Sequence, residues 1–136
     1  MITSQQSLRI LLVEDDNHIG RVIELALSDL GVPYEFTTVL SAEEGLDLWA
    51  QQPFDMLLTD YNLLGMTGLK LVELLAERGN RAPTVLVTAY DSPELRREAR
   101  ALNISAYLTK PFFMDELVET IRHLLPQIAA REVNGP

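Results

Sequence analysis

The chain has 136 residues, of which 47% are hydrophobic, so a single domain can bury a core without disulfides or structural metals. It contains no cysteine, which excludes disulfides, thiolate metal sites and thiol nucleophiles. Its net charge of -9 provides no electrostatic footprint for nucleic acid, and any DNA target would have to be contacted by another domain.

The apolar stretches are short compared with the roughly 20 residues that a membrane-spanning helix needs. The N-terminus lacks the charged and apolar regions of a signal peptide. We therefore expect a cytoplasmic protein that does not contact a membrane.

Short β-rich segments alternate with helical periodicity five times along the chain. This alternation predicts an α/β fold, in which a doubly wound parallel sheet of five strands carries helices on both faces. The strands are expected at 8–14, 34–39, 54–60, 83–88 and 104–109.

The first three expected helices have recognisable ends. Apolar residues recur at spacings of three and four over 19–30, and Gly31 follows as a stop. Ser41 and Glu44 form a capping box that opens the second helix. The third helix begins near Thr67 and stops at Gly79.

The fourth helix opens with Ser92 as its cap and Pro93 in its first position. The fifth has an apolar stripe from Met114 to Ile128 that should pack against the sheet. Pro126 is expected to weaken the end of that helix. We therefore divide the chain into an N-terminal extension 1–7, a domain 8–126 and a C-terminal tail or cut linker 127–136.

Charged and polar residues follow the predicted strands. The acidic cluster 14–16 follows the first, Asp60 ends the third, Thr88 ends the fourth and Lys110 follows the fifth. Ligands of open parallel sheets bind outside the carboxyl ends of the strands, so these residues should share one site. Converging carboxylates repel one another, and a hard divalent cation relieves that repulsion, so we predict Mg²⁺ on Asp15 and Asp60.

A carboxylate beside Mg²⁺ can also attack a phosphoryl group and form an acyl phosphate. Asp60 is the candidate nucleophile because it closes a central strand. The transferring phosphoryl group spreads negative charge over three oxygens, which Mg²⁺, Lys110 and Thr88 could each stabilise.

These motifs resemble the receiver domain of bacterial two-component response regulators, over roughly 8–125. The resemblance rests on Val13-Glu14-Asp15-Asp16, Asp60 followed eight residues later by Gly68, Val87-Thr88-Ala89, and Tyr107-Leu108-Thr109-Lys110-Pro111-Phe112. It implies a flavodoxin-like strand order 2-1-3-4-5. It further implies a signalling domain, not a conventional enzyme, that catalyses its own phosphorylation and dephosphorylation.

The resemblance assigns the site residues. Asp60 would be the phosphoacceptor, and Lys110 and Thr88 would contact the phosphoryl group. Asp15 and Asp60 would bind Mg²⁺ directly, Glu14 would bind it through water, and Asn62 would offer its backbone carbonyl.

The resemblance also implies how the signal is passed on. Thr88 and Tyr107 would act as switch residues, Asn62 and Tyr90 would tune hydrolysis, and the peptide bond before Pro111 would be cis. The phosphodonor would be a sensor histidine kinase or phosphotransfer protein. The target would be an output domain or partner protein that recognises the fourth helix, fifth strand and fifth helix, and phosphorylation-dependent homodimerisation stays open.

Three positions depart from the usual family pattern. Leu64 replaces a proline, so we expect a less rigid loop over 62–67. Asn103 replaces a glycine, and asparagine tolerates the left-handed backbone that such a turn needs. Phe113 replaces a helix cap, and we interpret it as an exposed apolar contact.

Each site residue also has a local explanation. Asp15 or Asp16 could cap the first helix, Asp60 or Thr88 could stabilise turns, and Lys110 could be a solvated surface lysine. Tyr107 could simply protect an edge strand. Their joint placement at strand ends favours the site.

Three other functions are alternatives to a receiver domain. An aspartyl-phosphate phosphatase usually has a second acid two residues after its nucleophile, where this chain has Asn62. An unphosphorylated interaction module would require the site geometry to fail. A nucleotide- or flavin-binding domain is disfavoured because no Gly-rich phosphate loop follows the strands.

The remaining conspicuous side chains receive structural interpretations. His18 and His123 lack partners at metal-binding spacing and are expected at the surface. Trp49 is expected in the core. Arg96, Arg97 and Arg100 are expected on a solvated helix face, with a partner role there as the alternative.

Overall fold

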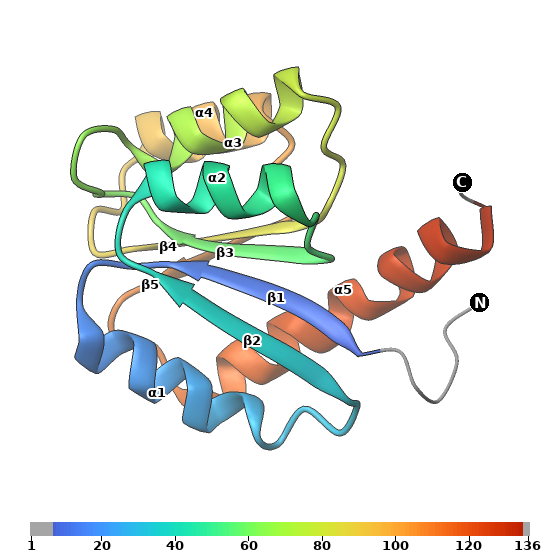
Figure 1. Ribbon diagram of the computed structural model, residues 1–136. Coiled ribbons are helices and arrows are strands. Elements are labelled where there is room, and N and C mark those ends of the chain that lie inside the picture. The colour runs from blue at the N-terminus through green and yellow to red at the C-terminus, as the bar shows by residue number, and fades with distance from the viewer. Residues whose placement is uncertain (1–6, 135–136) are drawn as a thin grey trace.

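One parallel sheet organises the protein. The computed structural model describes residues 7–134. Its strand order is β2-β1-β3-β4-β5, as predicted (Figure 1). The strands are β1 (Leu8–Val13), β2 (Tyr34–Val39), β3 (Met56–Asp60), β4 (Thr84–Thr88) and β5 (Ala106–Thr109).

Five helices connect these strands and cover both faces of the sheet. They are α1 (Asn17–Leu27), α2 (Ala42–Gln51), α3 (Gly68–Glu77), α4 (Pro93–Ala101) and α5 (Met114–Asn134). Helices α1 and α5 lie on one face, and α2, α3 and α4 lie on the other (Figure 1). The predicted doubly wound α/β fold is therefore confirmed.

The alternation of side chains along β1 divides the core between the two faces. Ile10 and Leu12 belong to the apolar cluster under α1 and α5, whereas Leu11 and Val13 belong to the cluster under α2 and α3. A strand covered on both faces has to be apolar throughout. This is why the first strand is a continuous apolar run in the sequence.

Local chemistry fixes the helix ends largely as predicted. The side chains of Ser41, Thr67 and Ser92 accept N-capping hydrogen bonds at α2, α3 and α4. Asn103 has a φ of 59°, so asparagine does take the left-handed conformation after α4. The cap of α1 is Asp16, and that helix ends at Leu27, although Leu30 beyond it is still buried.

Two strands begin two residues later than expected, β3 at Met56 and β5 at Ala106. Phe54 was expected in the third strand, but it precedes β3 and packs on Trp49, with 5.3 Å between ring centroids. Trp49 lies in the core as predicted. The apolar character of Phe54 alone did not show whether it belongs to β3 or packs in the core just before that strand.

The last helix differs most from expectation. Helix α5 continues through Pro126 to Asn134, where the sequence predicted a tail from 127 onward. Ile128, beyond the proline, is only 2% exposed and packs in the cluster under α1 and α5, which confirms its predicted place in the apolar stripe. That burial offsets the backbone hydrogen bond that proline removes. Residues 1–6, 135 and 136 lie outside the described part, and the division into domain and flanking segments stays a prediction.

Within residues 7–134, no helix combines the length and the apolar character needed to cross a bilayer.

The central strand provides a test of this packing. Leu58 is fully buried in β3, so Leu58→Ala should lower the free energy of unfolding by about 2–5 kcal/mol in urea titrations followed by circular dichroism. The matched control is Leu25→Ala on the outer side of α1, where the side chain is 63% exposed and the change should stay within about 0.5 kcal/mol. Equal losses in the two variants would contradict the assigned core.

Candidate functional site

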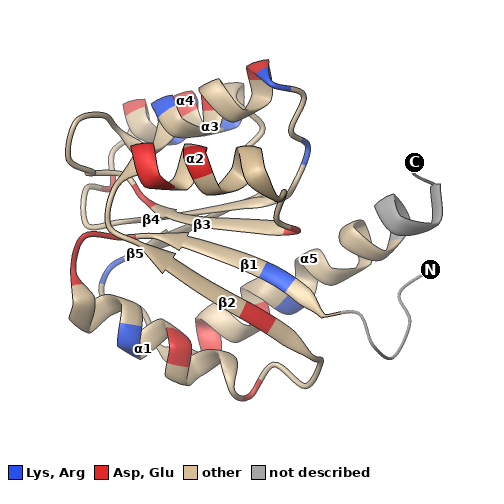
Figure 2. Ribbon diagram, in the orientation of Figure 1, with Lys and Arg blue, Asp and Glu red and all other residues tan. Residues whose placement is uncertain are grey.

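Three carboxylates converge at the carboxyl edge of the sheet. Oxygens of Glu14, Asp15 and Asp60 lie within 4.8 Å of one another. Glu14 is 2% exposed and Asp60 is 8% exposed, whereas Asp15 lies at the surface. The acidic residues that follow β1 mark this edge in Figure 2. The structure thus brings together the carboxylates that the sequence grouped.

Lys110 supplies the positive charge at this cluster. Its Nζ donates to Glu14 Oε1 at 2.9 Å and to Asp60 Oδ2 at 3.1 Å. Its side chain is 17% exposed, so the solvated surface lysine considered from the sequence is excluded. The Lys110–Pro111 peptide bond is cis, as the resemblance implied.

The electrostatics of the cluster are unbalanced. Burial raises the pKa of Glu14 to about 7, and the charge of Asp60 adds to that rise while the bond from Lys110 opposes it. Burial also disfavours the Lys110 ammonium, but its bonds to Glu14 and Asp60 outweigh that cost and raise the pKa of Lys110. Three carboxylates therefore lie together while the one ammonium bonds to only two of them, and the site favours a further cation.

The two neighbouring aspartates after β1 have different roles. The Asp16 side chain accepts a hydrogen bond from the backbone N–H of His18 at 2.8 Å and caps α1. The backbone N–H of Asp16 donates to Glu14 Oε2 at 3.2 Å, which helps to orient that carboxylate. The capping explanation therefore holds for Asp16, and Asp15 contributes its oxygen to the cluster.

The loop after Asp60 folds back against the end of β3. Asn62 and Thr67 form an isolated antiparallel bridge, and the Gly68 N–H donates to the Tyr61 carbonyl at 2.7 Å. A Cβ on Gly68 would clash with the Asp60 carbonyl oxygen. Only glycine allows α3 to start this close to Asp60. Leu64 lies in the same loop and is 72% exposed.

Thr88 connects the cluster edge to the next loop. It is fully buried at the end of β4, and its Oγ1 accepts a hydrogen bond from the Tyr90 N–H at 2.8 Å. The Tyr90 carbonyl accepts a bond from the Tyr107 hydroxyl at 3.4 Å. Tyr90 is 61% exposed, whereas Tyr107 is half-buried.

Sequence reasoning missed two residues beside this connection. The guanidinium of Arg96 lies 4.4 Å from the centroid of the Tyr107 ring, and Asp91 binds the same guanidinium. Arg96, Arg97 and Arg100 are exposed, as the sequence predicts, but Arg96 also contacts Tyr107. Its spacing from Asp91 in the sequence carries no signal of a contact with Tyr107.

The remaining expectations concern the surface. His18 and His123 are exposed, as predicted. Phe113 is 79% exposed, which agrees with its interpretation as an exposed apolar residue. Its N–H lies 3.4 Å from Glu116 Oε1 at the start of α5.

Comparison with known proteins identifies the family. The family model described as "Response regulator receiver domain" matches residues 10–122. Since this match covers most of the chain, the protein belongs to the response regulator receiver domain family.

Individual relatives agree with this assignment. The response regulator protein FleR of Pseudomonas aeruginosa is 38% identical, over 94% of this chain and 27% of FleR. The chemotaxis protein CheY of the same organism is 32% identical, over 89% of this chain and 98% of CheY. A CheY-like receiver domain from Methanospirillum hungatei has a TM-score of 0.81 at 28% identity, over 93% of this chain and 99% of that one.

The relatives differ in how much of their own length this chain covers. This chain spans 27%, 51% and 55% of the first three curated relatives it matches, and nearly all of CheY. The similarity to the longer relatives therefore concerns their receiver portion.

The close approach at Gly68 predicts a local substitution effect. Gly68→Ala should lower the free energy of unfolding by roughly 1–3 kcal/mol, because the new Cβ forces α3 away from the Asp60 carbonyl. Gly20→Ala in α1 is the matched control, since its Cβ would meet only ordinary contacts at 3.6 Å or more. That control should be neutral or stabilising in the same denaturant titration, because alanine favours helix. A neutral Gly68→Ala would show that this close approach does not constrain the loop.

Proposed function

We propose that this receiver domain accepts a phosphoryl group on Asp60 from a phosphohistidine of a sensor kinase or phosphotransfer protein. The observation that supports this most directly is the cluster around Asp60. Its carboxylate lies 3.1 Å from the Lys110 ammonium and shares an acidic cluster with Glu14 and Asp15. A nucleophilic oxygen, a cation for the phosphoryl group and oxygen ligands for a metal are thereby combined.

The donor set fits Mg²⁺, which prefers oxygen ligands and binds through one or two carboxylates. Asp15 and Asp60 would bind it directly, Glu14 through water and Asn62 through its backbone carbonyl. When bound, Mg²⁺ supplies positive charge to the phosphoryl oxygens and offsets the repulsion among the three carboxylates.

The transfer itself exchanges one bond to phosphorus for another. An Asp60 carboxylate oxygen forms a bond to the phosphorus while the bond between phosphorus and the donor imidazole nitrogen breaks. The imidazole leaves and takes up a proton from solvent. The Lys110 ammonium stabilises charge on one phosphoryl oxygen and the Thr88 hydroxyl donates to another. Hydrolysis returns Asp60 to a free carboxylate, at a rate that Asn62 and Tyr90 influence by limiting the access of water.

The output would be a changed binding surface. If Thr88 turns toward the phosphoryl group, its oxygen no longer accepts the bond from Tyr90, and the hydrogen-bonded Tyr90–Tyr107 contact has to adjust. Phosphorylation would thus shift an existing equilibrium of the surface formed by α4, β5 and α5. An output domain or partner protein would bind the changed surface. A second copy of this chain could be that partner, which would give a homodimer. A cytoplasmic location stays part of this proposal.

The first test of this function is the mass of the intact protein. Acetyl phosphate with Mg²⁺ should add one phosphoryl group to the native chain, and Asp60→Asn or a chelator should abolish the adduct. Asp55→Asn, which alters an aspartate that binds Arg9 just before the same strand, should retain the adduct.

Each contrary outcome of this test has a definite meaning. No adduct, with phosphate release also absent, would indicate the unphosphorylated interaction module. Steady turnover of a phosphate ester would indicate the phosphatase instead. An adduct on Asp60→Asn would remove Asp60 from its role.

Metal binding can be tested without any phosphodonor. Mg²⁺ at 100 times its dissociation constant should stabilise the folded chain by about 2.7 kcal/mol, measured as an upward shift of the melting temperature. Asp15→Asn should lose most of that shift because it removes a charged ligand. Asp16→Asn is the matched control, since asparagine still caps α1 and Asp16 lies outside the cluster. Equal losses in both variants would contradict the assignment of Asp15.

A further inference from the structure

The ring of Tyr107 is held by three different parts of the molecule. Its hydroxyl donates to the Tyr90 carbonyl at 3.4 Å, in the loop between β4 and α4. The guanidinium of Arg96 in α4 lies over the ring, 4.4 Å from its centroid. The ring also packs against the apolar cluster of Leu69, Leu86, Leu95 and Ala99. A change of rotamer would have to break the first two contacts together.

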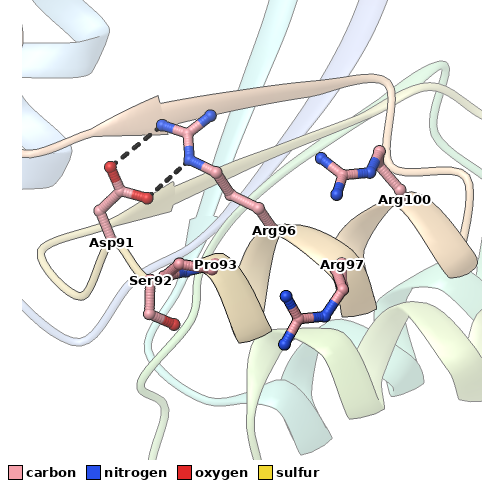
Figure 3. Close-up of a pocket in the computed structure, with 6 residues that line it drawn as sticks. All are labelled: Asp91, Ser92, Pro93, Arg96, Arg97 and Arg100. Carbon is pink, nitrogen blue, oxygen red and sulfur yellow. Dashed lines mark hydrogen bonds and ion pairs between the residues drawn. The ribbon is translucent and has the colours of Figure 1, made fainter.

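Asp91 holds the guanidinium of Arg96 in its position over the ring. Arg96 Nε donates to Asp91 Oδ1 at 2.7 Å, and Nη2 donates to Oδ2 at 3.1 Å (Figure 3). Two parallel bonds fix the plane of a guanidinium, which one bond would not do. The bonds from Arg96 also lower the pKa of Asp91, so the pair is ionised at neutral pH.

The exposure of the pair indicates what it contributes. The side chains of Arg96 and Asp91 are 46% and 44% exposed, so their attraction as charges is largely screened by water. The two parallel hydrogen bonds instead restrict the position of the guanidinium, and they thereby maintain its cation–π contact with Tyr107. Its effect is therefore on geometry more than on global stability.

We propose that Arg96 is a positioning residue for Tyr107. The guanidinium, oriented by Asp91, favours the observed rotamer of Tyr107 and so sets the balance between its rotamers. This inference deepens the proposed function, because it rests on Tyr107 being a switch residue. The Tyr90 N–H donates to Thr88, and Asp91 directly follows Tyr90. One short loop therefore contains both the carbonyl that accepts the Tyr107 hydroxyl bond and the carboxylate that orients Arg96.

The same helix offers a matched control. Arg97 is also exposed and lines the same groove as Arg96, together with Asp91, Ser92, Pro93 and Arg100 (Figure 3). Its ion pair is with Glu94, at 3.7 Å, and not with Asp91. Changing Arg97 removes a charge from α4 without removing the group that lies over Tyr107.

The test measures the side-chain rotamer directly. Three-bond couplings from the backbone nitrogen and carbonyl carbon of Tyr107 to its ring Cγ report the χ1 populations in the ¹³C,¹⁵N-labelled full chain. Wild type should show one dominant rotamer, and Arg96→Gln should raise the ratio of minor to major rotamers roughly fivefold. Arg96→Lys should behave like Arg96→Gln, because it keeps the charge but not the planar fork. Arg97→Gln should match wild type.

A double variant tests whether Asp91 acts through Arg96. Asp91→Ala should shift the populations in the same direction, and Asp91→Ala with Arg96→Gln should shift them by less than the sum of the two single variants, because part of the effect of Asp91 is exerted through Arg96. Unchanged populations in folded Arg96→Gln and Arg96→Lys, or an equal shift in Arg97→Gln, would overturn the proposal. The experiment uses no phosphodonor or metal, so its result is independent of whether Asp60 accepts a phosphoryl group.

Discussion

The contact of one ammonium with two largely buried carboxylates is the interaction on which the site depends. Lys110 lies between Glu14 and Asp60, and without it both carboxylates would lack a positive partner inside the protein. Burial raises the pKa of Glu14 to about 7, the charge of Asp60 adds to that rise, and the bond from Lys110 only partly opposes it. The site is therefore suited to ligands that bring their own compensating charge, a divalent cation with a phosphoryl group.

The strand order explains why a lysine can fill this role. Strands β1 and β3 are adjacent, so Glu14 and Asp60 meet without long side chains. Lys110 follows β5, which is separated from β3 by β4, and its backbone N–H donates to the Thr88 carbonyl of β4 at 2.8 Å. Only a long side chain can cross that width and still place its charge at Asp60. The topology thus selects the residue type at this position.

Much of this arrangement could be predicted from the sequence, because it depends on local patterns. Continuous apolar runs mark strands buried on both faces, and polar residues at their ends mark one edge of a parallel sheet. What the sequence left open depends on how side chains pack. The apolar stripe predicted that Ile128 is buried, but it did not show that α5 continues past Pro126 to Asn134, and the apolar run alone did not show that Phe54 packs on Trp49 outside β3. Similarly, the choice between Asp15 and Asp16 as helix cap depends on side-chain direction, which the sequence leaves open.

The pair of Asp91 and Arg96 beside β5 illustrates the same limit. Arg96, Arg97 and Arg100 are all exposed, as expected, but the expectation did not include the contact of Arg96 with Tyr107 on β5. Because Thr88 binds the Tyr90 N–H and Asp91 follows at once, the loop from 88 to 91 connects the carboxyl edge of the sheet to α4. A movement of Thr88 would therefore displace both contacts of Tyr107 through adjoining backbone, and no rearrangement of the buried core is needed to carry it.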